Sequence, residues 1–250
     1  TPQRQPAIGP PSRRLILGCR KEKDEFMENR IIWDPDRVVL RMVNFLRHQT
    51  ELEARPHRRF GDMALIYQLL LHQRDGIWLT AQVTWDMIKQ RMDEQELYET
   101  ACANSRICLP PAAEDIREVL KECVLDGCLE RHPKDIGSAL IAAGTETKQM
   151  QPEENWPMYV VTNQSRLYGA AVLFYSDILD ELAKKFEGDL LILPSSIHEV
   201  LVLPYMGEAY HQAFLKMVRQ ANQTVVLEEE ILSDSIYRYD RRAGELCQID

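Results

Sequence analysis

Two strand-like apolar runs that enclose a short polar turn place the strongest constraint on how this chain can fold. Residues 191–204 read LeuIleLeuProSerSerIleHisGluValLeuValLeuPro. The runs at 190–193 and 199–203 flank ProSerSerIleHis, as expected for two strands joined by a turn. A strand is predicted before them at 158–162. A helix is predicted over about 169–186, because apolar residues recur there every three or four positions. This order indicates an α+β fold.

Further strands and helices are predicted on both sides of this region. The run at 63–71 is almost continuously apolar, and ArgAspGly separates it from a second run at 77–83. That pattern favours a hairpin, although a helix over 60–72 fits the same residues. A strand at 234–240 precedes a turn at 241–244. Amphipathic helices are expected from Asp34 onwards and at 94–103, 113–125 and 210–222. The chain should therefore be α+β, with a mixed or antiparallel sheet and several packed amphipathic helices.

The helix expected from Asp34 rests on its start signal. AspProAsp supplies an N-cap in Asp34 and a first-turn proline in Pro35. Apolar residues then fall on one helical face, namely Val38, Met42, Phe45 and Leu46. The sequence therefore predicts that the first ordered helix begins here.

The distribution of prolines and charges predicts the domain organisation. The first 12 residues hold four prolines, and residues 1–30 carry seven Arg or Lys against four Asp or Glu. We expect a flexible basic arm over 1–30. The remainder, 31–250, is interpreted as a single α+β domain. Its subregions, 31–130 and 156–250, should be joined by a linker, because residues 130–156 hold few large apolar side chains.

Composition excludes some classes of function. With 45% hydrophobic and 28% charged residues and no apolar run near the ~20 residues of a membrane helix, we expect no membrane span. The formal charge of −9 argues against a nucleic-acid partner. Basic clusters at 55–59 and around Arg13 fit either an acidic partner or a solvated loop and arm. No export signal is visible, and the six cysteines are spread as reduced thiols would be, so a cytoplasmic location is expected.

Three neighbouring residues could form part of a metal site. Cys123, Cys128 and His132 are potential ligands, but their spacing is not CxxC and no fourth ligand is obvious. Cys123 also continues a helical apolar series, which favours a buried thiol over a metal ligand. We expect no metal.

The polar turn holds the residues of greatest chemical interest. Ser195, Ser196, His198 and Glu199 supply a hydroxyl, an imidazole and a carboxylate, the components of nucleophilic catalysis. On a strand, Ser196 and His198 would share a face and Glu199 would diverge. There is no GxSxG motif, and Val202 stands where a zincin would have its second histidine. The alternative is that Pro194 and the serines form and cap a tight turn.

Two further residues are candidates for binding. Asn163 follows a predicted strand, so its amide would contact either a ligand or its own turn. Gly169 would allow close approach of a backbone or start the helix. No glycine-rich phosphate loop follows any strand, so no nucleotide and no other cofactor is expected.

Five motifs together resemble a known family. They read ArgProHisArgArgPheGlyAspMetAlaLeuIleTyr (55–67), GluLeuTyrGluThrAlaCysAlaAsnSer (96–105), TyrValValThrAsnGlnSerArgLeuTyrGlyAlaAla (159–171), ProSerSerIleHisGluVal (194–200) and LeuSerAspSerIleTyrArgTyrAsp (232–240). The chain resembles a domain-of-unknown-function family of Gram-positive gut anaerobes and their mobile elements over about 35–240. The resemblance implies a fold without an assigned reaction. It also implies that an amino-terminal α+β segment of the family is missing before Asp34.

Two functional hypotheses follow. The first is a non-enzymatic protein-interaction or regulatory module with an unidentified protein partner, which uses Asn163, Gly169 and the turn Ser195, Ser196, His198 and Glu199. The second is a hydrolase in which Ser195 or Ser196 acts with His198 and an acidic group. The oligomeric state is left open by the residues. Geometry separates the two hypotheses, because catalysis requires a hydroxyl within about 3.2 Å of the imidazole and an open pocket.

Overall fold

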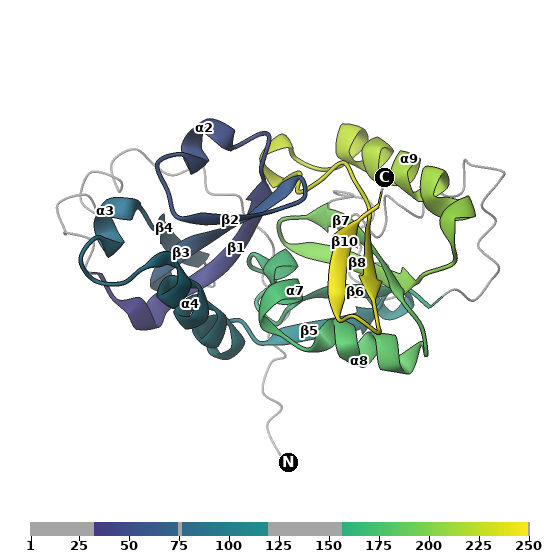
Figure 1. Cartoon of the computed structure of the whole chain (residues 1–250), viewed down its shortest axis with the longest axis horizontal. Helices are drawn as coiled ribbons and strands as arrows, with labels where there is room; N and C mark the ends of the chain where they lie inside the picture. The colour runs from purple at the N-terminus through teal and green to yellow at the C-terminus, as the bar shows by residue number, and fades with distance from the viewer. Residues whose placement is uncertain (1–32, 75–76, 120–156, 250) are drawn as a thin grey trace, which may run out of the picture.

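The computed structural model describes residues 33–74, 77–119 and 157–249, which form two lobes that share a core (Figure 1). Each lobe is built on an antiparallel sheet with helices packed on it, so the α+β prediction is confirmed. The predicted arm at 1–30 and linker at 130–156 lie outside the described residues.

The amino-terminal lobe has a four-stranded sheet centred on one long strand. Its strands are β1 (Val38–Asn44), β2 (His57–Phe60), β3 (Met63–Arg74) and β4 (Ile77–Gln82). β3 pairs with β1 on one edge and with β2 and then β4 on the other. The predicted hairpin is therefore confirmed as β3–β4, and the alternative helix over 60–72 is wrong. The short helix α2 (Gln49–Leu52) lies between β1 and β2.

The helix predicted from Asp34 is wrong beyond its first turn. The Asp34 carboxylate does accept a hydrogen bond from the Asp36 N–H at 3.2 Å, but only the 3₁₀ turn η1 (Pro35–Arg37) follows. The chain then extends into β1, which is buried at every position except Arg41. A strand buried on both faces is apolar at nearly every position. Such a run always contains apolar residues three or four positions apart, and these were mistaken for one face of a helix.

The outer edge of β1 is covered by a helix. After α3 (Trp85–Ile88), the helix α4 (Glu94–Cys108) starts at a capping box formed by Asp93 and Glu96, which confirms the helix predicted near 94–103. The Leu40 N–H donates to Ser105 Oγ at 2.9 Å, and Asn104 Nδ2 donates to the Val38 carbonyl at 2.9 Å. These side chains satisfy backbone groups that would otherwise be unpaired at a sheet edge.

The carboxy-terminal lobe has a six-stranded sheet with the order β10-β9-β7-β8-β6-β5. Its strands are β5 (Pro111–Asp115), β6 (Tyr159–Asn163), β7 (Leu190–Ser196), β8 (Glu199–Pro204), β9 (Tyr237–Asp240) and β10 (Glu245–Gln248). The predicted strands at 158–162, 190–193 and 199–203 are confirmed, and of the strand predicted at 234–240 only residues 237–240 form β9.

The helix predicted at 113–125 is wrong at its start. β5 continues to Asp115, residues 116–119 are helical, and residues 120–125 lie outside the described part. Pairing of β5 with β6 overrides the helical propensity of its two alanines. β5 thus belongs to the carboxy-terminal sheet although it falls within the predicted subregion 31–130.

Helices cover both faces of this sheet (Figure 1). On one face lie η3 (Gly169–Ala171), α7 (Val172–Tyr175) and α8 (Ile178–Lys185), so the helix predicted at 169–186 is present but interrupted at Ser176, whose backbone is extended. On the other face η4 (Glu208–Tyr210) leads into α9 (His211–Thr224), which confirms the helix predicted at 210–222, and η5 (Glu228–Glu230) follows. Alternate residues of the strands pack against the two sets of helices.

One hydrophobic cluster joins the lobes. It contains Leu40, Met42 and Tyr67 from the amino-terminal sheet together with Tyr175 and Tyr237 from the other lobe. All five are essentially inaccessible to solvent. The two sheets therefore share a core at their junction.

Replacement of Ser105 tests how much the hydrogen bonds at the covered edge of β1 contribute to stability. We expect Ser105→Ala to lower the free energy of unfolding by about 1–3 kcal/mol, because the buried Leu40 N–H loses its acceptor. Urea unfolding followed by circular dichroism measures the change. Ala103→Ser, at an exposed position of the same helix, reports the intrinsic difference between the two residues. Equal stability of Ser105→Ala and wild type would contradict this role.

Candidate functional site

The predicted polar turn is a tight connection between β7 and β8, buried at the junction of the lobes. Ser195 and Ser196 end β7 and Glu199 begins β8. The exposed fractions of these three residues are 3%, 6% and 4%. The His198 side chain, in the turn itself, is 18% exposed. The sequence predicted that Ser196 and His198 share one face of a strand. That prediction is wrong, because His198 lies in the turn and belongs to neither strand.

The hydroxyls of this turn bond to groups other than the imidazole. Ser195 Oγ lies 3.4 Å from Glu199 Oε1, and Ser196 Oγ accepts the His198 backbone N–H at 3.1 Å. The imidazole Nδ1 accepts the Tyr168 N–H at 3.3 Å, and Nε2 lies 3.6 Å from Glu230 Oε1. Within the described residues the structure thus brings the four predicted side chains together without a hydrogen bond between a serine hydroxyl and the His198 imidazole.

His198 belongs to a stack of rings that spans the two lobes. Its imidazole lies nearly parallel to the Tyr168 ring, with centroids 6.2 Å apart. The Arg41 guanidinium of β1 lies 4.7 Å from the same Tyr168 centroid, and Thr80 Oγ1 of β4 is 3.1 Å from the Tyr168 hydroxyl. Tyr168 adopts a left-handed backbone conformation, with φ of 55°, which is uncommon for a bulky residue and is retained where surrounding contacts enforce it.

Gly169 allows the backbone of β6 and the polar turn to approach. A Cβ at this position would lie 2.1 Å from Thr162 Oγ1 and 2.2 Å from the His198 carbonyl oxygen. Those two atoms are themselves joined, because Thr162 Oγ1 donates to the His198 carbonyl at 2.7 Å. Of the two roles considered for Gly169, close backbone approach is therefore present, and the residue also begins η3.

Asn163 uses its side chain to close its own turn. Its Oδ1 accepts the N–H groups of Ser165 at 3.0 Å and Leu167 at 3.3 Å, and its Nδ2 donates to the Leu167 carbonyl at 2.7 Å. The residue is fully buried. These contacts are those of an Asx turn, and they hold the loop that presents Tyr168 to the amino-terminal lobe.

The described residues contain neither a metal-binding cluster nor a membrane-spanning helix. There, no group of three His, Cys, Asp or Glu is placed to hold a metal ion. The residues Cys123, Cys128 and His132 lie outside that part of the chain. None of the described helices combines the length and apolar character that crossing a bilayer requires.

A groove of about 580 Å³ lies between β5 and α8. Its position was not predicted, because it depends on β5 being placed beside a helix from a distant part of the chain. The small residues of ProAlaAlaGluAsp (111–115) leave this space open. Their small size was the one feature of the sequence that could have indicated a groove here. The lining residues come from the end of α4, from β5 and β6, and from the α7–α8 region, and they include Arg106, Ala113, Tyr159, Asp177, Glu181 and Lys185.

Charged side chains at the two ends of the groove are already paired. Arg106 Nη2 lies 3.8 Å from Asp177 Oδ1, and Lys185 Nζ donates to the Tyr159 hydroxyl. At the Tyr159 end, hydrogen bonds from Arg117 lower the pKa of Asp115 to about 2, with a smaller contribution from Lys185. Asp115 is therefore ionised at neutral pH.

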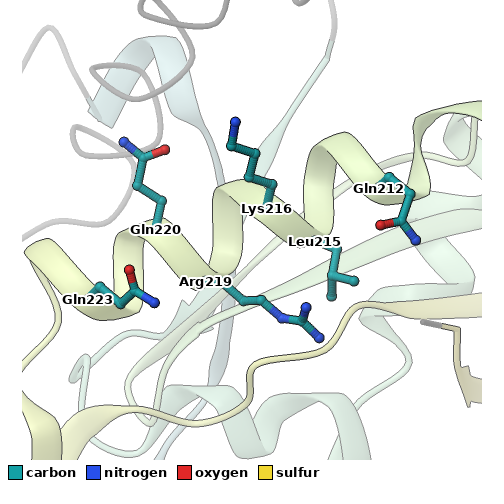
Figure 2. Close-up of a pocket in the computed structure, with 6 residues that line it drawn as sticks. All are labelled: Gln212, Leu215, Lys216, Arg219, Gln220 and Gln223. Carbon is teal, nitrogen blue, oxygen red and sulfur yellow. The ribbon is translucent and has the colours of Figure 1, made fainter.

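A second hollow, of about 380 Å³, lies along α9 (Figure 2). Lys216 and Gln220 point to one side of the helix, whereas Leu215 and Arg219 point to the other. Arg219 Nε donates to the Asp234 carbonyl at 3.2 Å. Because these side chains diverge, they do not form a convergent binding site.

Comparison with known families assigns the chain. Residues 23–241 match DUF5688, a family of unknown function. The chain belongs to this family. The match confirms the resemblance to a family without an assigned reaction. No curated protein and no solved structure matches this DUF5688 chain.

The packing around Gly169 gives a stability test. We expect Gly169→Ala to lower the free energy of unfolding by about 3 kcal/mol, because the added methyl group meets both Thr162 and the backbone of His198. Chemical denaturation measures the effect. Gly188→Ala is the matched control, since its Cβ would meet nothing closer than 3.8 Å. Equal losses in the two variants would show that the contact at Gly169 is easily relieved.

Proposed function

We propose that this DUF5688 protein is a non-enzymatic protein-interaction or regulatory module. One observation carries the proposal: the polar side chains of the turn are used to stabilise the fold. Ser196 bonds to the main chain of His198, and the imidazole lies between Tyr168 and Glu230. Polar residues that are buried and already paired contribute to the specificity and rigidity of a fold rather than to turnover.

A hydrolase that uses Ser195 or Ser196 with His198 and Glu199 is the competing hypothesis. It requires a hydroxyl that can transfer its proton to the imidazole and a substrate that can reach both. Both serines are almost fully buried, and the Ser196 hydroxyl accepts a backbone N–H. These contacts favour the module over the enzyme.

We further propose that it is a bacterial, cytoplasmic protein that binds a protein partner, and that it belongs to a mobile element, as the family resemblance implies. Cys102, Cys108 and Cys247 are free thiols in the described part of the chain, as is usual in a reducing compartment. The formal charge of −9 disfavours a nucleic-acid partner and favours a basic protein surface.

An activity-based probe tests the enzyme hypothesis directly. We expect a fluorophosphonate probe to leave the purified full chain unlabelled, because neither serine hydroxyl is bonded to an imidazole. Mass spectrometry of the treated protein provides the measurement, and a known serine hydrolase in the same reaction controls for probe reactivity. Stoichiometric labelling of Ser195 or Ser196 in wild type, absent from the corresponding alanine variant, would favour the hydrolase instead.

Affinity capture from the native host tests the interaction hypothesis. We expect a specific protein to be retained both by wild type and by a folded Ser196→Ala/His198→Ala double variant, since the turn is buried. Mass spectrometry identifies the protein, and calorimetry with the purified components measures binding. Loss of the partner in a double variant with native circular dichroism would place the surface at the turn. Absence of any partner that binds after purification would contradict the proposal.

A further inference from the structure

The outer edge of β5 has backbone groups directed away from its sheet. Within the described residues β5 pairs on one side only, with β6. The Ile116 N–H donates to the Met158 carbonyl, and the Gln164 N–H donates to the Pro110 carbonyl, both at 2.9 Å. Because bonding alternates along an antiparallel strand, even-numbered residues of β5 bond to β6. The N–H and C=O of Ala113 therefore point outward.

The β1 edge of the amino-terminal sheet is treated differently. β1 has its outward groups bonded by Ser105 and Asn104 of α4. No described side chain does the same for Ala113. The outward position two residues earlier is Pro111, which has no N–H, so Ala113 provides the first outward donor of the strand. β5 thus keeps a short edge that a further strand can extend.

The groove between β5 and α8 leaves room beside this edge. Ala112 and Ala113 are small, and the space that they leave measures about 580 Å³. That volume falls within the usual range of ligand sites, about 300–1,000 Å³. The edge and the groove share Ala113, so a chain that pairs with β5 would also lay its side chains into the groove.

Charged side chains along α8 indicate which residues a bound chain would carry. Asp177, Glu181 and Lys185 are spaced four residues apart and therefore lie on one side of the helix, where all three line the groove. Asp177 pairs with Arg106, and Lys185 bonds to Tyr159. The exposed Glu181 side chain forms no hydrogen bond or ion pair with the described residues. It is placed to receive a cation.

We infer that the β5 edge and its groove bind an extended, basic peptide segment of a partner protein by strand addition. The inference rests on the proposed interaction function and names its site. Backbone groups of the segment pair with Ala113, and a Lys or Arg side chain contacts Glu181. The net charge of −9 favours encounter with a basic segment.

Selection from a library tests the site without knowledge of the partner. The full chain is used to select from phage-displayed random linear 12-residue peptides, and enriched peptides are synthesised with a fluorescent label. Dissociation constants are then measured by fluorescence anisotropy at low and high salt. We expect peptides enriched in Lys or Arg, with binding that weakens as salt is raised.

Two variants locate the bound peptide. Ala113→Pro removes the outward N–H and leaves the β5–β6 bonds intact, so it should weaken binding about tenfold, the effect of roughly one lost hydrogen bond. Ala113→Ser retains the N–H and is its control. Glu181→Gln should weaken binding about threefold and reduce its salt dependence, as expected for one exposed ion pair. Glu187→Gln, an exposed position outside the groove, makes the same change of charge and should leave binding unchanged.

The outcomes distinguish the site from the function. Loss of affinity in Ala113→Pro and Glu181→Gln, but not in their controls, supports the inference. Peptides that bind wild type and both variants equally would overturn the β5 site while the interaction function stands. A chain that selects no peptide and captures no partner would overturn both. Self-association that sedimentation detects in wild type and not in Ala113→Pro would assign the edge to a second copy instead, and would also overturn the inference.

Discussion

The requirement that buried N–H and C=O groups be paired governs the polar residues of this protein. Ser105 and Asn104 bond to the edge of β1, and Asn163 bonds to the loop that follows β6. In the polar turn, Thr162 donates to the His198 carbonyl, and Ser196 accepts the N–H of the same residue. The sequence marks Asn163 and Ser196 as candidates for binding or catalysis, yet each side chain is used as a substitute for a missing backbone partner.

The same contacts fix how the two lobes meet. The Tyr168 ring contacts both Arg41 of one lobe and His198 of the other. The lobes are also joined at Asp62, where Ser233 Oγ donates to both carboxylate oxygens at 2.8 Å and the Tyr237 hydroxyl donates to the same group. With a shared hydrophobic cluster between these polar contacts, the lobes behave as parts of one packed unit rather than as separate halves around an open cleft.

The sequence correctly predicted the helices, strands and turns that are determined by residues close together in the chain. The β7–β8 turn, the β3–β4 hairpin and α4 follow from proline and glycine placement, apolar runs and the helical spacing of apolar residues, and they were found. The failures, at Asp34 and at 113–125, have a tertiary cause. Val38–Asn44 is apolar at five of its seven positions because neighbours cover both of its faces, and Pro111–Asp115 is extended because β6 pairs with it. Neither neighbour can be read from the residues themselves.

The site was harder to predict than the fold for a related reason. Sequence reasoning selects residues that are chemically versatile, such as Ser196 and His198, but versatility is also what makes a side chain useful as an internal partner. A binding site is instead marked by groups that remain unsatisfied after folding. Here the outward N–H of Ala113 and the carboxylate of Glu181 meet that description within the described residues, although alanine would never be chosen as a functional residue from its type. The backbone that it presents, and not its side chain, is what a partner would recognise.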